Sequence, residues 1–523
     1  MTLEQVWIAG QWRDANASSS FVASNPATGE PLQDAYSVST WADCDAALDA
    51  AVDAARALRK IEGPQIAAFL EAYASAIEAD ATQIVAMAHE ETGLAITPRL
   101  QAIELPRTTT QLRQAAAAAR EGSWQQVVID TKNNIRSHFA AFGPVVVFGP
   151  NNFPFAFNGV AGGDFAAAIA AGCPVIAKAH PLHPGTSKLL ARCADRALRV
   201  SGLPPATVQM LYHVANEDGL RLVSDARVSA SSFTGSRAAG MKLKAAADTA
   251  GNVMYLEMSS LNPVVLLPGV VAEHWEALAT ELADSCLAAS GQFCTSPNLI
   301  LAVASEETES LATALAETLS KRPSTPLLSE AGLQNLHEGV QWLVSAGANV
   351  ATGADYAEGE GWRYKNTLLR ISGHAFLAEA EKLQREAFGN ATLLVVAKNL
   401  QELVTTLESL EGNLTGSIYA SKTGTDDAIY GEVADALRAR VGRLMNNKMP
   451  TGVALSPAMN HGGPFPSTAH PGFTAVGIPR SLLRFGALHC YDGVSDDRLP
   501  AALRDQAPSP EMWRSIDGQW VKG

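Results

Sequence analysis

The chain has 523 residues, of which 47% are hydrophobic and 18% are charged, and its formal net charge is -14 at pH 7. A chain of this length forms roughly two to four domains, and the composition is typical of a globular protein and not of a disordered one. The negative charge repels polyanions and no cluster of Lys and Arg offsets it, so we expect no nucleic-acid partner.

Neither the N-terminus nor any apolar stretch indicates export or membrane insertion. The first residues, Met1 to Trp7, include an acidic residue and lack the cationic lead of a secretory signal. The longest nearly apolar stretch, 165–177, contains Gly172 and Pro174 and is too short to cross a bilayer. We therefore expect a cytoplasmic protein with no membrane span.

The cysteines are scattered and form no Cys-x-x-Cys pair. The chain has six, at positions 44, 173, 193, 286, 294 and 490. This spacing disfavours a disulfide framework and a structural zinc site, and we expect no metal ion. For any one of them the simplest role is that of a small buried apolar side chain, so a reactive role needs separate support.

The first third of the chain predicts short strands, then helices, then a hairpin. Residues 7–25 alternate turn formers with Trp, Ile and Val, as short strands do. From 40 to about 120 apolar residues recur every three or four positions, which indicates amphipathic helices. The polar and β-branched stretch 123–138 is typical of a hairpin arm.

Beyond this arm, apolar strands alternate with helices. Strands are expected at 143–149, 174–178, 208–212 and 228–233, and near-continuous apolar strands of this kind belong to a parallel sheet covered on both faces. The pattern predicts a doubly wound, nucleotide-type sheet. After about residue 265 the alternation restarts with a long helix over 274–291 and continues to about Met445, which indicates a second α/β domain.

Three residues stand where reacting groups are usually presented. Cys294 lies in a tight loop after the helix over 274–291, and a nearby charge or backbone N–H groups could lower its thiol pKa. Glu257 ends an apolar strand, where a partly buried carboxylate can act as a general base. Asn152 lies between a buried strand and a Gly-rich helix entry, where a side-chain amide can donate to an oxyanion. A buried thiol, a turn-capping acid and an ordinary turn Asn are the alternatives.

A fourth segment could bind a phosphate. Phe233-Thr234-Gly235-Ser236-Arg237 ends a strand and begins a helix with Ser at its cap, which leaves backbone N–H groups free. A plain Ser-capped helix is the alternative. The chain has neither a Gly-x-Gly-x-x-Gly fingerprint nor a Walker loop, so a bound nucleotide would need other phosphate contacts.

Taken together and in this order, these segments resemble the aldehyde dehydrogenase superfamily over essentially the whole chain. The matching segments are Asn152–Pro154, Lys178, Phe233–Ser236, Gly291–Thr295 and Glu386–Gly389. Two departures concern the backbone: Met258-Ser259-Ser260-Leu261 replaces the usual Leu-Gly-Gly-Lys after the glutamate, and Asn390 replaces a common Pro. Neither departure changes a reacting group.

The resemblance implies a fold, a domain arrangement and a reaction. The fold is α/β, with a Rossmann-type cofactor domain, a second α/β catalytic domain and a β-hairpin oligomerisation arm. The implied domains are 1–122 and 139–265 for the dinucleotide, 266–445 for the catalytic cysteine, 446–483 for the return to the cofactor domain with active-site loops, and 123–138 and 484–523 for the arm and tail.

The resemblance also implies residue roles. Cys294 attacks the aldehyde carbon, Asn152 and the backbone N–H of Cys294 hold the oxyanion, and Glu257 activates the water that hydrolyses the thioester to a carboxylic acid. The implied cofactor contacts are Lys178 at the adenosine ribose, Gly235 and Ser236 at the phosphates, Glu386 at the nicotinamide ribose and Phe388 near the ring.

The cofactor is expected to be NADP, with NAD possible. NAD-preferring members often carry a Glu three residues after the Lys, and it repels a 2′-phosphate. Here Pro181 stands at that position. Without the carboxylate a 2′-phosphate is tolerated, and Lys178, His180 or Arg237 could pair with it.

The sequence leaves two classes of aldehyde substrate open. Ala161–Asp164, Lys178–Ser187, Glu257–Ser260 and Met449–Val453, with His461-Gly462-Gly463-Pro464, look most like 2-oxoglutarate semialdehyde (2,5-dioxopentanoate) dehydrogenases, but similar segments occur in NADP-dependent fatty aldehyde dehydrogenases. A distal carboxylate needs a cation, for which Arg107 is a candidate. A long-chain substrate needs an apolar tunnel, which Phe153, Phe155 and Phe157 could line.

Other enzyme classes fit less of the chain. A cysteine hydrolase would pair Cys294 with a His, and none of the 11 histidines lies in a recognisable partner motif. A coenzyme A-acylating dehydrogenase generally lacks the base that Glu257 supplies, and a non-catalytic relative would lose the nucleophile. The hairpin arm and the strand-like segment 487–491 favour pairing between subunits, so we expect a homodimer or homotetramer.

Overall fold

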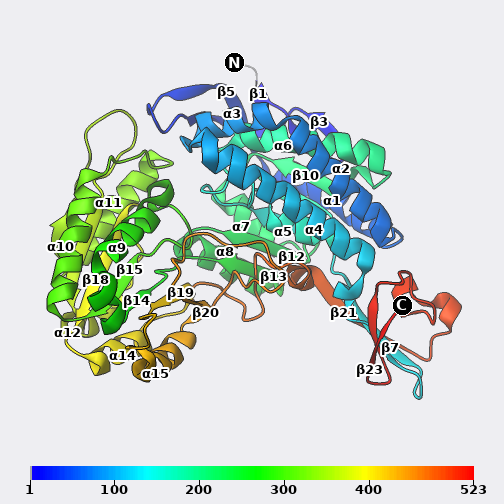
Figure 1. Ribbon diagram of the computed structural model, residues 1–523. Helices are drawn as coiled ribbons and strands as arrows, with labels where there is room; N and C mark the ends of the chain where they lie inside the picture. The colour runs from blue at the N-terminus through cyan, green and yellow to red at the C-terminus, as the bar shows by residue number, and fades with distance from the viewer. Residues whose placement is uncertain (1–2) are drawn as a thin grey trace.

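The computed structural model describes residues 3–523 and shows two α/β lobes and a small protruding sheet (Figure 1). The first lobe is built on a seven-stranded sheet in the order β13-β12-β8-β9-β10-β2-β3. Strands β8, β9, β10, β12 and β13 are parallel, whereas β2 runs antiparallel to β10. The strands of this sheet are β2 (Val6–Ile8), β3 (Gln11–Arg13), β8 (Val145–Phe148), β9 (Val175–Lys178), β10 (Val208–Leu211), β12 (Ala230–Thr234) and β13 (Val253–Glu257).

Helices cover both faces of this sheet, as the continuous apolar strands predict. They are α1 (Trp41–Leu58), α2 (Gly63–Ala79), α3 (Ala81–Thr92), α4 (Leu105–Glu121), α5 (Gly163–Ala170), α6 (Pro184–Ser201), α7 (Asn216–Ser224) and α8 (Arg237–Ala250), with a π-helical segment over Ile96–Glu104. A smaller sheet at the N-terminal end contains β1 (Leu3–Glu4), β4 (Ala17–Ser24), β5 (Pro31–Ser39) and β11 (His213–Val214). No helix within residues 3–523 is long and apolar enough to cross a membrane.

The second lobe is a seven-stranded sheet in the order β16-β17-β18-β15-β14-β19-β20, parallel except for β16. Alternate strand residues face opposite sides, so Val265 and Leu299 lie in one core and Val264 and Ile300 in another. Its strands are β14 (Val264–Leu266), β15 (Leu299–Val303), β16 (Asn349–Thr352), β17 (Thr367–Ser372), β18 (Ala391–Ala397), β19 (Asn413–Tyr419) and β20 (Val441–Asn446). Its helices are α9 (Pro268–Leu287), α10 (Glu306–Lys321), α11 (Glu330–Ser345), α12 (Gly373–Ala378), α13 (Ala380–Leu383), α14 (Leu400–Glu408) and α15 (Asp427–Arg438).

The expected hairpin arm is part of a five-stranded sheet that stands apart from both lobes (Figure 1). Its order is β21 (Gly486–Asp492), β7 (Ile135–Ala141), β6 (Val128–Asp130), β22 (Trp513–Ile516) and β23 (Gln519–Lys522). Along one edge β21 pairs antiparallel with β7 of the same chain, so the expected pairing of 487–491 between subunits falls to its other edge. Only the outer edge of β21 is left for a partner, and Leu488 on it is 65% exposed.

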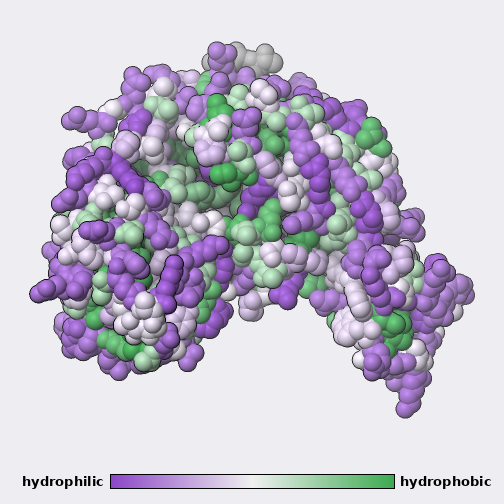
Figure 2. Space-filling model, in the orientation of Figure 1, coloured by the Kyte–Doolittle hydropathy of each residue, from purple (hydrophilic) through white to green (hydrophobic). Residues whose placement is uncertain are grey.

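One long irregular segment joins the lobes. Residues 447–479 form neither a helix nor a strand, and their trace crosses from the second lobe back to the first (Figure 1). The segment is held to the end of β13, where Met258 N donates to Ser467 O over 2.8 Å and Thr468 forms a bridge with Glu257. Figure 2 shows mostly hydrophilic side chains on this face, with hydrophobic ones gathered where the surface is hollowed between the lobes.

Candidate active site

The loop that presents Cys294 is shaped by an abrupt end to α9. The helix was expected to run to Gly291, but it ends at Leu287 because Ala289, Ser290 and Gly291 all take positive φ values, of 49°, 56° and 68°. A Cβ atom on Gly291 would lie 2.1 Å from the carbonyl oxygen of Gly389, so only glycine fits there. The cysteine loop therefore packs directly on the loop that carries Glu386.

Cys294 meets two buried polar side chains. Its Sγ lies 3.4 Å from His461 Nε2, and the same nitrogen lies 3.1 Å from Glu257 Oε1. Glu257 and His461 are each 1% exposed, whereas Cys294 is partly exposed and can be reached from solvent. Glu257 Oε2 and His461 Nδ1 are buried and have no hydrogen-bond partner within residues 3–523.

The charge environment keeps the thiol protonated. Burial raises the pKa of Cys294 well above its usual value, and the neighbouring Glu257 carboxylate raises it further. A thiol attacks as the thiolate, so a neighbouring base has to take its proton. His461 and Glu257 are the groups in contact with it.

Two asparagines hold the loop around the cysteine. Asn152 is buried, and its Nδ2 donates to the carbonyl oxygen of Gln292 over 2.8 Å. Asn262 Nδ2 donates to the carbonyl oxygens of Cys294 and Ser296, each over 2.9 Å. An amide nitrogen carries two hydrogens, so Asn152 keeps one for another acceptor beside the cysteine loop.

An aromatic wall borders the cysteine. The Phe153 ring lies 5.2 Å from that of Phe293 and 5.3 Å from that of Phe157, and Phe157 lies 5.8 Å from the His461 ring. Phe155 was also expected to line such a wall, and this expectation was wrong. Its side chain is 1% exposed and belongs to the core of the first lobe.

Two arginines lie close enough to Cys294 for a charge on its sulfur to change their pKa values. Burial lowers the pKa of Arg107 on α4 and of Arg443 on β20, and a charge on Cys294 raises both. Arg107 Nη1 donates to Val453 O, but its Nε and Nη2 are buried without a hydrogen-bond partner within residues 3–523. These N–H groups are available to an acceptor that enters the site.

The predicted cofactor residues gather at the carboxyl edge of the first sheet. Lys178 ends β9 beside Phe148 of β8, and burial lowers its pKa to about 8. His180 Nδ1 accepts from Leu182 N over 3.2 Å, which leaves Nε2 as the nitrogen that can donate. An ammonium group without a carboxylate partner within residues 3–523 and a donating imidazole suit a phosphate-bearing ligand.

The start of α8 also lies at this edge. Ser236 caps the helix by accepting from Ala239 N over 3.3 Å, and the first-turn N–H groups have no partner inside the helix. Two of the predicted contact groups already have partners within the chain. The Gly235 N–H is used by the carbonyl oxygen of Glu257 at 3.1 Å, and the Arg237 guanidinium is paired with Glu411 at 2.8 and 3.3 Å. Neither is free for a phosphate in this arrangement.

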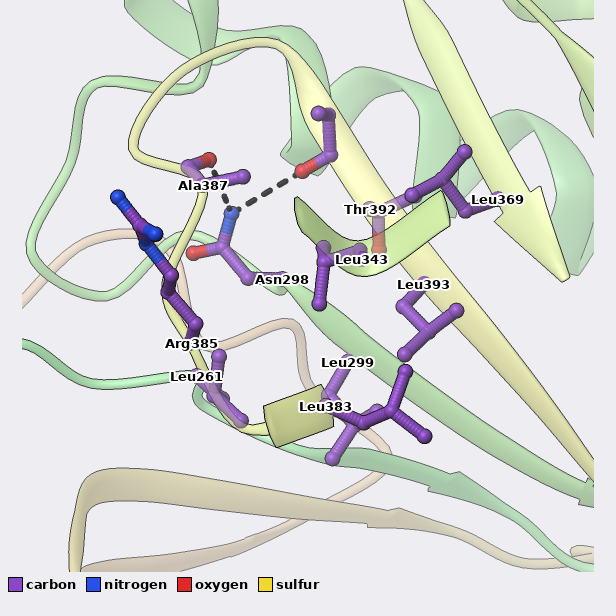
Figure 3. Close-up of a pocket in the computed structure, with 11 residues that line it drawn as sticks. Leu261, Asn298, Leu299, Leu343, Leu369, Leu383, Arg385, Ala387, Thr392 and Leu393 are labelled. Carbon is purple, nitrogen blue, oxygen red and sulfur yellow. Dashed lines mark hydrogen bonds between the residues drawn. The ribbon is translucent and has the colours of Figure 1, made fainter. Parts of the chain in front are cut away.

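Glu386 lies on the loop between α13 and β18. Burial raises its pKa to about 7, and hydrogen bonds from Ser259 and Ser260 oppose this shift. Asn298, four residues after Cys294, donates to the carbonyl oxygens of Ala387 and Ala391 at 3.5 and 3.0 Å. Figure 3 shows the Asn298 side chain directed toward Ala387. The loop of Glu386 and the partly exposed Phe388 is thus tied to the cysteine segment.

Comparisons with known proteins decide the family. The family model described as "Aldehyde dehydrogenase family" matches residues 12–469. The chain belongs to the aldehyde dehydrogenase family. The resemblance found in the sequence is thereby confirmed, and the enzyme oxidises aldehydes.

Two of the curated relatives of this aldehyde dehydrogenase match nearly its whole length. It is 37% identical to alpha-ketoglutaric semialdehyde dehydrogenase 2 of Azospirillum brasilense, over 97% of the chain and 98% of the relative. It is 33% identical to alpha-ketoglutaric semialdehyde dehydrogenase of Acinetobacter baylyi, over 96% of each. The solved structure of lactaldehyde dehydrogenase from Escherichia coli superposes with a TM-score of 0.79 at 22% identity, over 94% of the chain and 98% of that structure, which confirms the fold.

The aldehyde dehydrogenase also has a histidine that the sequence argument missed. His461 was noted only within a family-like segment, and the cysteine-hydrolase alternative was set aside because no histidine looked like a partner of Cys294. The structure shows such a contact, so that reason was wrong, and the family match excludes the hydrolase instead. A His directly before Gly-Gly-Pro in a loop bound to the catalytic strand was the available signal.

Arg443 and Asn262 were missed as well. An arginine on a partly buried strand is a signal that could have been read, because a cation held away from water needs a partner. Asn262 has φ 51°, and nothing in its local sequence shows that its side chain reaches Cys294.

Proposed function

We propose that this aldehyde dehydrogenase oxidises 2,5-dioxopentanoate to 2-oxoglutarate with NADP as the preferred cofactor, through a thiohemiacetal and then a thioester on Cys294. The three-way contact between Cys294, His461 and Glu257 carries the proposal for the reaction. The first lobe and residues 446–483 would hold the cofactor, and 266–445 would supply the thiol. The names of the two curated relatives support the choice of substrate.

In the first step the Cys294 thiol loses its proton and its sulfur attacks the aldehyde carbon. His461 Nε2 is in contact with both Sγ and the Glu257 carboxylate, so it can accept the proton and be stabilised by that carboxylate. The second N–H of Asn152 Nδ2 and the backbone N–H of Cys294 would hold the developing oxyanion. When bound, NADP supplies the acceptor for the hydride.

In the second step water hydrolyses the thioester. Glu257 takes a proton from the water, and the sulfur leaves as the thiolate and regains its proton. His461 keeps the carboxylate close to the thioester by contact at 3.1 Å. The cofactor contacts of this chain would be Lys178, His180, the N-terminus of α8 at Ser236, Glu386 and Phe388, while Gly235 and Arg237 would contribute only after leaving their present partners.

The proposed preference for NADP predicts that a carboxylate at position 181 lowers activity with NADP but not with NAD. NADP should show the higher kcat/KM in parallel titrations with NAD, because within residues 3–523 no carboxylate stands beside Lys178 and His180 to repel a 2′-phosphate. Pro181→Glu should lower kcat/KM for NADP by about 10–100-fold and spare NAD, since a charged hydrogen bond contributes about 1.5–3 kcal/mol. Pro181→Ala is the matched control, and a higher kcat/KM with NAD in the unaltered enzyme would contradict the proposal.

The substrate proposal rests on unpaired N–H groups near the thiol. Arg107→Met keeps an apolar stem but removes the cation, so it should raise KM for 2,5-dioxopentanoate by about 10–100-fold and leave hexanal oxidation nearly unchanged. Arg113→Met is the control, because Arg113 lies on the same helix in an exposed pair with Glu78. Equal effects of Arg107→Met on both aldehydes would show that Arg107 does not bind the carboxylate of 2,5-dioxopentanoate.

A medium- or long-chain aliphatic aldehyde is the second candidate. The rings of Phe153, Phe157 and Phe293 form an apolar wall beside Cys294, which suits an alkyl chain. Steady-state kinetics with aliphatic aldehydes of increasing length separate the two. A kcat/KM that rises with chain length above the value for 2,5-dioxopentanoate would favour this alternative.

We also propose that the enzyme forms a homodimer or homotetramer through the outer edge of β21. The strand lies at the edge of its sheet and exposes Leu488, and an exposed strand edge favours pairing with another chain. The mass in solution, measured by light scattering after gel filtration, tests this, and a monomer would contradict it.

A further inference from the structure

The contacts of Cys294 also bring together three side chains that can serve as metal ligands. A sulfur, an imidazole nitrogen and a carboxylate oxygen, from Cys294, His461 and Glu257, all lie within 4.8 Å of one another. Each comes from a different part of the chain: the cysteine loop, the segment that joins the lobes and the end of β13. Three donors of different chemistry that converge on one point are the requirement for a metal ion.

Two of the three distances between the donors are close to those between zinc ligands. With Zn–S near 2.3 Å and Zn–N or Zn–O near 2.0–2.2 Å, neighbouring donors of a tetrahedral zinc lie about 3.4–3.6 Å apart. Here Sγ and Nε2 are 3.4 Å apart, and Nε2 and Oε1 are 3.1 Å apart. Sγ and the Glu257 carboxylate oxygen lie within 4.8 Å of each other, and rotation of the Glu257 side chain toward Sγ would bring all three donors around one ion.

The site also holds an unused ligand atom. Glu257 is 1% exposed, and its Oε2 is buried without a hydrogen-bond partner within residues 3–523. A neutral imidazole carries one N–H, so Nε2 cannot serve Sγ and Oε1 fully at the same time. A cation at the centre would be bonded to all three donors.

The loop segment of His461 is fixed in place before any ligand arrives. His461 N donates to Thr474 Oγ1 over 3.0 Å, and its carbonyl oxygen accepts from Ala475 N over 2.9 Å. A Cβ atom on Gly442 of β20 would lie 1.6 Å from the carbonyl oxygen of Gly462, so the segment lies directly against the second lobe. Fixed ligands lower the entropy cost of binding.

We propose that Cys294, His461 and Glu257 bind one Zn²⁺ ion reversibly, and that this ion inhibits the enzyme by occupying its nucleophile. The Zn–S bond forms as the thiol proton passes to solvent, and no electron is transferred. A thiolate, a neutral imidazole and a carboxylate suit zinc, whereas Mg²⁺ and Ca²⁺ prefer oxygen donors only. The partly exposed side of Cys294 leaves the fourth position to water.

The ion should bind more weakly than a structural zinc. His461 Nδ1 has no acceptor within residues 3–523, and loss of such an outer contact costs about 10–100-fold in affinity. The nearby guanidinium groups of Arg107 and Arg443 also oppose a cation. Chelators should therefore restore full activity, which distinguishes reversible inhibition from a structural metal.

Direct binding tests the site independently of its proposed roles in the reaction. The full-length protein is first treated with a chelator. It is then titrated with Zn²⁺, with binding measured by calorimetry, and separately with Co²⁺, with binding measured by absorbance. We expect one ion per chain and a thiolate-to-cobalt charge-transfer band. Cys294→Ala should remove the band, and both Cys294→Ala and His461→Ala should weaken zinc binding by more than about 100-fold.

Cys490→Ala is the matched control, because Cys490 is exposed on β21 and lies outside the site. It should keep zinc binding, the cobalt band and zinc inhibition. Zinc should also protect Cys294 of the unaltered enzyme from iodoacetamide until EDTA is added, a readout that needs no variant. Equal zinc affinity in the folded Cys294→Ala and Cys490→Ala proteins, or alkylation that zinc does not slow, would overturn the proposal.

Discussion

Cys294→Ala should lower the rate of aldehyde oxidation by on the order of 10⁴-fold or more, because it removes the sulfur that forms the covalent intermediate. Of the other cysteines, Cys286 is the nearest in sequence, and it is buried and donates to Pro297 O. It cannot replace the nucleophile without moving the loop. The measurement is NADPH formation followed by absorbance, with cofactor binding measured in parallel by fluorescence.

Cys490→Ala should keep full activity in the same assay, since its side chain is exposed on the arm. Cys294→Ala should still bind the cofactor, because Lys178 and the start of α8 are unchanged. Full activity in Cys294→Ala would refute the proposed mechanism. Loss of cofactor binding together with activity would point to a misfolded variant, which circular dichroism and a thermal melt identify.

Glu257→Gln should separate the two halves of the reaction. Without the carboxylate, hydrolysis of the thioester should slow by roughly 10²–10⁴-fold, the usual contribution of a general base. Attack by Cys294 should persist, so rapid mixing should show a stoichiometric burst of NADPH followed by a slow steady state. A variant with no burst and no turnover would show that Glu257 is needed before hydrolysis.

Glu257→Gln should also lower the pKa of the Cys294 thiol. Burial is the first cause of the raised pKa of Cys294, and the Glu257 charge is the second. Removing that charge lowers the pKa, so more thiolate is present at neutral pH and alkylation by iodoacetamide speeds up. The pH profile of alkylation should move to lower pH in Glu257→Gln, and an unchanged profile would contradict the proposed coupling.

The alternation of apolar strands and helices predicted the sheets, and strand ends predicted where Glu257 and Lys178 lie. Periodicity carries this information because a sheet covered on both faces needs apolar residues throughout. The backbone around Cys294 was harder to predict. Helix propensity extends α9 to Gly291, and only tertiary contacts force Ala289 and Ser290 into positive φ.

Contacts between side chains that are far apart in the sequence were also not predicted. His461 is 167 residues from Cys294, and Arg443 contributes from a strand of the second lobe. Local patterns report which face of an element is buried, but they do not report which distant loop covers it. Phe155 failed for a related reason, because its neighbours in sequence border the site while it turns into the core.

The contact between Gly291 and Gly389 limits how this enzyme can vary. The two backbones touch where any side chain on Gly291 would intrude, so a substitution there would push the loops of Cys294 and Glu386 apart. Substitutions elsewhere can reshape the aromatic wall or the arginines without moving the sulfur relative to Glu386. Specificity for the aldehyde can therefore drift during evolution, whereas the alignment of nucleophile and cofactor is inherited as a unit.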